Sequence, residues 1–467
     1  ERAALAVMMT REGPFTLPQV ARPLVLSGIA STANQLTEPH KPRTRHVLFD
    51  LLHKGLIVNV ATSSLDRGPR VLALQTSFDI PAEVRSALPM ALLHQPEPQP
   101  DLFADPKVMP ARVVARDPGT FLRELLFVWA ELRNQPAQPL KAGGLGKRER
   151  RRLAEALGLT EPEGLDKVAW LYEVLVALNL VQESGTEISA VDNHAATLFW
   201  AAKPSQHARD IRRAYVRMAA PLCKDRAALR LTGYLQGLEI LPCDVLRERI
   251  IGTLDQLSTG GWVPFDLIMS LLEGDLPGSL LFSEHTMGVV YGQLHYYGNA
   301  YRREVEKTLS NTELALTRCA LEELCAMGLV ELGYVSTEAA DVSAVRVVQE
   351  VTSTMSSGRA GPSILEQPWQ MILQPDFQVL ALGPVPLRVL AGMEHIAQRE
   401  KLDETVITYR LTRDAVYRAL QSGETAEAIA AYLEETTGQA IPQNIQRSLE
   451  EWYQQYERII IRRNIRI

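Results

Sequence analysis

Positive charge is concentrated in residues 141–152, which read Lys-Ala-Gly-Gly-Leu-Gly-Lys-Arg-Glu-Arg-Arg-Arg. Glycines ahead of a basic helix can place backbone amides and cationic side chains around a phosphate group. The candidate phosphate-binding residues are Lys141, Lys147, Arg148, Arg150, Arg151 and Arg152. The alternative is a solvated basic helix face that contacts no partner.

This segment superficially resembles a nucleotide-binding P-loop but lacks the residues that the chemistry needs. A P-loop requires a glycine five residues before the Gly-Lys pair and a Ser or Thr after it, because that hydroxyl holds magnesium. Here Lys141 stands at the first position and Arg148 at the last. The sequence therefore predicts no ATP site in this segment.

A second candidate DNA surface surrounds the expected helix at residues 47–53. In a winged helix, the last helix before the wing is the recognition helix, and its N-terminal residues meet bases or phosphates. The candidate contacts are Arg43, Arg45 and His46 at this helix, and Arg67 and Arg70 on the wing. The alternative is that this unit docks a protein.

Catalytic and metal-binding patterns are not evident in the sequence. The nine histidines are dispersed, and no HExxH, GxSxG or DEAD-type motif occurs. The four cysteines, Cys223, Cys243, Cys319 and Cys325, lack metal-ligand spacing and are typical of reduced thiols in the cytosol. We therefore expect no catalytic residue, no metal and no cofactor, so the protein is not expected to be an enzyme.

Helical periodicity dominates the elements that must position these side chains. Apolar residues recur at spacings of three and four, for example in 120–132, 167–180 and 313–327. Gly55, Asn179 and Gly328 each stand where a helix gives way to a short apolar strand, as expected for a left-handed residue that ends a helix. The sequence predicts a mainly α fold with small β-hairpins, arranged as an array of winged-helix or helix-turn-helix units.

Length and composition set limits on this array. A chain of 467 residues is too long for one hydrophobic core. The predicted segments are a winged-helix-like unit at 1–88, a Pro-rich linker at 89–112, a second winged unit at 113–200, a helical connector at 201–247, a third helical or winged unit at 248–345, a flexible linker at 346–363 and a terminal domain at 364–467. No apolar run is long enough to span a membrane. The net charge of −6 means that DNA binding must come from local patches.

The terminal domain has a recognisable order of elements. Gln374-Pro375-Asp376-Phe377 precedes the apolar strand 378–382, and three helices follow. Thr412 and Thr425 are expected N-caps, and Gly423 and Gly438 are expected helix ends. Ile441-Pro442 introduces the last helix, which carries Glu451-Trp452.

This order resembles the N-terminal domain of XPB-type DNA helicases, which also occurs in bacterial helicase-associated proteins that lack a motor. The resemblance covers about residues 365–460 and implies contacts with partner subunits. The segment Leu-Lys-Ala-Gly-Gly-Leu-Gly at 140–146 resembles sequences of the same bacterial proteins more loosely. No helicase motor motif is present, so no catalytic residue transfers.

We therefore expect a non-catalytic DNA-associated accessory protein of a bacterial cytoplasm, where association with the nucleoid would be compatible with its function. It would bind duplex or junction DNA, a helicase or a DNA-repair protein, with salt-sensitive and sequence-tolerant affinity. The alternative is a protein–protein scaffold with no DNA contact, and an ATP-dependent helicase is the least favoured reading. The partner, the preferred DNA structure and the oligomeric state are not encoded in a recognisable motif.

Overall fold

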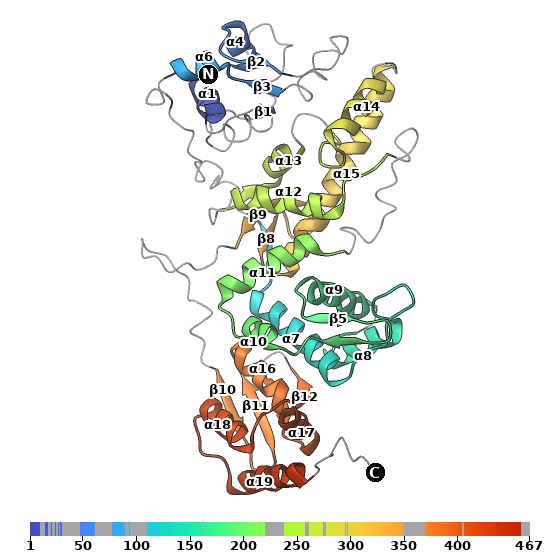
Figure 1. Ribbon diagram of the computed structural model, residues 1–467. Coiled ribbons are helices and arrows are strands. Elements are labelled where there is room, and N and C mark those ends of the chain that lie inside the picture. Colours follow the sequence, from blue (N-terminus) through green and yellow to red (C-terminus); the bar gives the residue numbers. More distant parts are fainter. Residues whose placement is uncertain are drawn as a thin grey trace, which may run out of the picture. The chain divides into compact units, whose positions relative to one another are not determined.

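The computed structural model divides the chain into two compact units, each built from two stretches of sequence (Figure 1). Unit 1 comprises Glu1–Pro118 and Tyr215–Glu350, and unit 2 comprises Gly119–Ala214 and Val351–Ile467. The structure describes residues 1–9, 15–16, 20, 24, 27, 29, 47–60, 77–88, 93, 110–160, 162–219, 238–256, 261–273, 277–294, 296, 298–348, 369–403 and 406–458. Helices with small antiparallel sheets make up these residues, which confirms the predicted mainly α class.

The first part of unit 1 is a small core of short elements. They are α1 (Arg2–Met9), β1 (Phe15–Thr16), α4 (Val47–His53), β2 (Val58–Asn59), β3 (Ser77–Asp79) and α6 (Ala82–Ala87). The strands pair antiparallel in the order β1-β3-β2. Phe15, Leu51, Ile57 and Phe78 are buried in a single cluster with the apolar side of α1, so the core draws on β1, β3, α1 and α4 and on the residue directly before β2.

The second part of unit 1 packs helices on a four-stranded antiparallel sheet of order β4-β8-β9-β7. Its elements are β4 (Arg112–Val114), α12 (Cys243–Gln256), β7 (Val263–Pro264), α13 (Phe265–Glu273), α14 (Glu284–Leu294), α15 (Asn299–Ala326), β8 (Val330–Tyr334) and β9 (Val342–Val347). The boundary between the predicted linker and the predicted second winged unit lies within β4, which pairs with β8. Gly328 ends α15 with φ +73°, as its sequence position predicts.

Unit 2 begins with helices around a two-stranded hairpin. These elements are α7 (Pro118–Asn134), α8 (Lys147–Ala156), α9 (Glu163–Ala177), β5 (Val181–Glu183), β6 (Ile188–Ala190), α10 (His194–Trp200) and α11 (Pro204–Arg217). The first residue of α7 and the last three residues of α11 belong to unit 1. The core of this part is lined by the inward face of α7, which buries Phe121, Leu125 and Trp129, and by Leu171 of α9. Three helices followed by a hairpin match the predicted element order, and the assignment to the winged-helix class stays a prediction.

The remainder of unit 2 is a four-stranded antiparallel sheet of order β10-β11-β13-β12, with four helices. Its elements are β10 (Gln370–Leu373), β11 (Gln378–Leu382), α16 (Leu387–Ile396), β12 (Gln398–Leu402), β13 (Val406–Arg410), α17 (Arg413–Gln421), α18 (Ala426–Thr437) and α19 (Gln443–Arg458). The expected caps are confirmed: Thr412 accepts the Ala415 amide proton, and Thr425 accepts that of Ala428. Gly438 ends α18 in the left-handed conformation.

None of the helices in the described ranges is both long enough and apolar enough to cross a membrane.

Candidate nucleic-acid interface

The basic segment forms a tight glycine loop that leads into α8. Leu140 donates its amide proton to the Gly144 carbonyl, and Gly143 donates to the Leu140 carbonyl. Gly143 and Gly144 have φ values of +85° and +78°, which only glycine adopts at no steric cost. Leu145 is buried and anchors the loop. The fold therefore fixes the point at which the basic helix begins.

The six cations of this segment divide into an outer and an inner set. Lys141, Lys147, Arg148 and Arg151 are exposed, whereas Arg150 and Arg152 are half-buried. Lys147 and Arg151 are one turn apart on α8, and Arg148 lies three residues before Arg151, so these three share one helix face. This face, together with Lys141, is the group of cations open to an external anion.

Arg152 is engaged within the chain. Its Nε donates to Glu149 Oε2 at 3.0 Å, and its Nη2 donates to the Gln135 carbonyl at 3.0 Å. Arg150, two residues earlier, is also half-buried but lies on a different side of α8. Arg152 therefore helps to fix α8 against the residues that follow α7.

The glycine loop already holds one anion, the carboxylate of Glu183 on the hairpin strand β5. The Gly144 amide donates to Glu183 Oε2 at 3.1 Å and to Oε1 at 3.3 Å, and the Tyr172 hydroxyl donates to Oε2 at 2.8 Å. A Cβ added at Gly143 would stand 3.2 Å from Glu183 Oε1. Burial, followed by the bond to Glu183, raises the pKa of Tyr172. The sequence offered no sign of this contact, because an isolated Glu on a short strand has no motif.

The helix directly before the hairpin, α9, is acidic at its start. Glu163 and Asp166 lie in its first turn, and Lys167 pairs with Glu124 at 2.6 Å. These carboxylates compensate the positive end of the helix dipole and repel an approaching phosphate. The cations of this part of unit 2 that can meet DNA are therefore on α8 rather than on α9.

The second predicted DNA surface cannot be placed. Arg43, Arg45, His46, Arg67 and Arg70 all lie outside the described residues. The helix that follows the first three, α4, begins at Val47 as expected. The role of these five residues stays a prediction.

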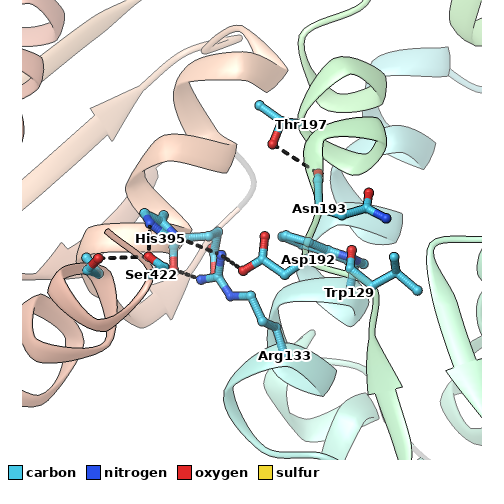
Figure 2. Close-up of polar contacts among 10 residues, drawn as sticks. Trp129, Arg133, Asp192, Asn193, Thr197, His395 and Ser422 are labelled. Carbon is cyan, nitrogen blue, oxygen red and sulfur yellow. Dashed lines mark hydrogen bonds and ion pairs between the residues drawn. The ribbon is translucent and has the colours of Figure 1, made fainter. Parts of the chain in front are cut away.

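A polar cluster in unit 2 joins residues far apart in sequence (Figure 2). Arg133 of α7 donates to His395 Nδ1 at 3.1 Å and lies 3.9 Å from Asp192. Ser422 Oγ is 3.0 Å from His395 Nε2. Since a guanidinium can only donate, His395 Nδ1 must accept, and the neutral ring carries its proton on Nε2.

This tautomer does not suit a Ser–His catalytic dyad. A general base must accept the serine proton at Nε2, but here Nε2–H donates to Ser422 Oγ. The Ser422 hydroxyl in turn donates to the Ala419 carbonyl at 2.7 Å. Burial and the adjacent Arg133 hold the pKa of His395 below its usual value. The cluster is a structural contact between α7 and the C-terminal part of unit 2.

A buried ion cluster lies beside it. Arg399, with 4% of its side chain exposed, donates to Glu394 Oε1 at 3.1 Å and to Glu131 Oε1 at 2.9 Å. The Tyr409 hydroxyl also donates to Glu394, at 3.0 Å, and the Arg399 guanidinium lies 4.1 Å from the centre of the Phe127 ring. Burial raises the pKa of the Glu394 carboxyl, and Arg399 partly opposes the shift. Each buried charged side chain in this cluster therefore relies on its partners to offset the cost of its burial.

No group of three or more His, Cys, Asp or Glu side chains in the described ranges is arranged to hold a metal ion.

Comparison with known proteins links one segment of the chain to helicases. Residues 371–465 match the family model described as helicase conserved C-terminal domain. No curated protein matches the chain. The matched segment spans β10 to α19, the same region whose residue order suggested a helicase-related domain. It indicates a helicase-related role associated with nucleic acid.

Proposed function

We propose that this protein is a non-catalytic, DNA-associated accessory factor that binds the nucleic-acid backbone and works with a helicase or a repair protein. The single observation that carries the proposal is the exposed cationic face formed by Lys147, Arg148 and Arg151 on α8, with Lys141 beside it. The helicase-related segment at 371–465 supports the context. The terminal domain would correspond to the N-terminal domain of XPB-type helicases.

The chemistry of the α8 face suits phosphates rather than bases. Lysine and arginine side chains on an exposed helix can each neutralise a phosphate and release a counterion, which gives affinity without sequence preference. The chain as a whole carries a net charge of −6. Long-range attraction to DNA is therefore weak, and binding depends on this local face and on low salt.

A matched pair of double variants tests the proposal. K147E/R151E reverses one lysine and one arginine a turn apart on α8, and R303E/K307E does the same on the exposed side of α15. Fluorescence anisotropy with labelled duplex, forked and single-stranded DNA across a salt series measures the effect. We expect K147E/R151E to weaken duplex binding and to reduce the slope of log K against log salt by about 2.

The control decides between a local site and general electrostatics. R303E/K307E changes the net charge by the same amount, so it should leave both duplex affinity and salt slope close to wild type. Equal losses in the two variants would contradict a site on α8. Measurable ATP hydrolysis by the pure protein would contradict the non-catalytic assignment.

The second candidate function is a protein-binding scaffold. The exposed side of α18 carries Glu427, Glu434 and Glu435, which repel a phosphate backbone but suit a basic protein surface. Under this reading the wild-type chain would not bind DNA even at low salt. A pull-down with helicases from the same cell would then identify the partner.

A further inference from the structure

The turn before β11 holds a bulky residue in an unfavourable backbone conformation. Phe377 has φ +71°, in the left-handed region that glycine and asparagine enter readily and that a large aromatic residue seldom adopts. A non-glycine residue held there costs of order 1–3 kcal/mol and persists only where its surroundings fix it. Gly or Asn would adopt this conformation with less strain, so the presence of a phenylalanine at this position calls for a separate reason.

The surroundings fix this turn at several points. Phe377 donates its amide proton to the Gln374 carbonyl and accepts that of Leu411 at its own carbonyl. Asn444 Nδ2 of α19 donates to the Pro375 carbonyl at 2.7 Å, and Arg410 donates to the Asp376 carbonyl at 3.0 Å. Contacts from β13 and α19 therefore hold the backbone in place, and the ring direction is fixed with it.

The ring that this turn presents is part of an aromatic group at the end of α19. Phe377 and Trp452 lie with ring centroids 5.9 Å apart and planes inclined by 32°. The ring of Tyr456, one turn beyond Trp452, has its centroid 6.2 Å from that of Tyr417 on α17. All four side chains are half-buried, whereas Ile445 and Leu449 earlier on α19 are fully buried. The inward stripe of α19 thus changes from buried aliphatic to partly exposed aromatic residues.

A guanidinium group lies beside these rings. Arg413, which is exposed, lies with its guanidinium 4.9 Å from the centre of the Tyr417 ring. Aromatic rings flanked by arginines are the chemistry by which proteins hold unpaired nucleotides, since bases stack on the rings and phosphates pair with the guanidiniums.

We propose that Phe377, Trp452, Tyr417 and Tyr456 form a stacking platform for the unpaired bases of single-stranded nucleic acid, with Arg413 beside it for a phosphate. The platform deepens the proposed function and rests on it, because it adds a single-strand site to the backbone contact on α8. Together the two sites would suit a junction at which duplex and single strand meet.

The test uses Phe377→Gly in the full chain. Glycine accepts the left-handed conformation, so this variant relieves backbone strain while it removes the stacking surface. The probes are a labelled oligothymidine of about 15 nucleotides, within the usual range of single-strand site sizes, and a duplex of equal length. We expect single-strand affinity to fall about fivefold to a hundredfold, as for the loss of one stacked base, and duplex affinity to stay unchanged.

Two further variants keep the test decisive. Phe377→Asn also tolerates the left-handed conformation and should behave like Phe377→Gly. Tyr296→Gly removes an aromatic side chain that is 87% exposed in unit 1, and should change neither affinity. Thermal unfolding of each variant shows whether the fold is intact.

Each outcome has a distinct meaning. Unchanged single-strand affinity in Phe377→Gly and Phe377→Asn overturns the platform, as does a fall in single-strand affinity that occurs only together with unfolding. Capture of a peptide partner that is lost in the same variants would assign the surface to protein instead. If wild type binds duplex but no single strand, only this inference fails; if it binds neither, the proposed function fails as well.

Discussion

His395 lies between a cation and a hydroxyl group, and both neighbours require a neutral ring. Protonation would place a proton on Nδ1, directly against the Arg133 guanidinium 3.1 Å away. Burial adds to this effect, so the pKa of His395 is lowered in the folded chain. The unfolded chain binds the proton more readily, and acidification therefore favours unfolding.

The consequence is a defined pH dependence of unit 2. The stabilisation due to neutral His395 is complete above its unfolded pKa of about 6.5 and is lost as the pH falls toward the folded value. We expect His395→Asn, whose side-chain oxygen can still accept from Arg133, to flatten the decline in unfolding free energy between about pH 7 and pH 5.5. One group changes that slope by at most about 1.4 kcal/mol per pH unit. Urea denaturation at several pH values measures it.

Other titrating groups set the background for this measurement. His207 also has a lowered pKa because of burial, so some decline should remain in the variant. Glu394 acts in the opposite direction, since burial raises its pKa and acidification relieves the buried charge. Both groups are present in the two proteins, so the difference isolates His395. An identical pH profile for wild type and His395→Asn would contradict this assignment.

At the scale of elements, the hairpin strand β5 and the glycine loop are joined by one carboxylate. Glu183 holds the Gly144 amide where an external phosphate could otherwise be bound, and adds negative charge at the loop that leads into α8. We expect Glu183→Gln to keep the acceptor for Gly144 and Tyr172 while removing the charge. Duplex DNA affinity should then rise by up to about fivefold at low salt, the size of an exposed charge interaction.

The matched control is Glu187→Gln on the same hairpin. Glu187 is exposed, and its backbone bonds with Ser184 do not involve its carboxylate. Anisotropy with the same duplex should show little change for this variant. Equal gains in the two variants would mean that only net charge matters and that the loop contact is irrelevant to binding.

Local signals in the sequence predicted the helices well and the polar strand poorly. Gly55, Asn179 and Gly328 all have positive φ at the predicted helix ends, because few other residues adopt that conformation. The edge strand β12, Gln398–Leu402, was missed, since its charged residues carry no apolar alternation. Phe377 was assigned to a turn, but no propensity predicts a phenylalanine with φ +71°.

At the scale of the whole molecule, the grouping of the segments could not be read from the sequence. The consecutive segments inferred from the sequence stay a prediction, and each compact unit combines stretches that are far apart in the chain. In unit 2 the joining contacts connect α7 to α16 and β12, for example Arg399 to Glu131 at 2.9 Å. Isolated charged residues more than 260 positions apart form no pattern that a single sequence reveals. The candidate DNA surface on α8, by contrast, is local, and its cations were identified from the sequence.

The ion pairs of Arg399 with Glu394 and Glu131 link the two stretches of sequence that form unit 2. We expect Arg399→Met to destabilise unit 2 by about 3–5 kcal/mol, because Glu394, with 2% of its side chain exposed, keeps a charge that has lost its main partner. Glu394→Gln combined with Arg399→Met should cost clearly less, since the neutral amide can still accept the Tyr409 hydroxyl proton. Urea denaturation of wild type, both single variants and the double variant gives the free energies of unfolding that a double-mutant cycle requires. Additive losses would contradict the coupling and show that the two side chains act independently.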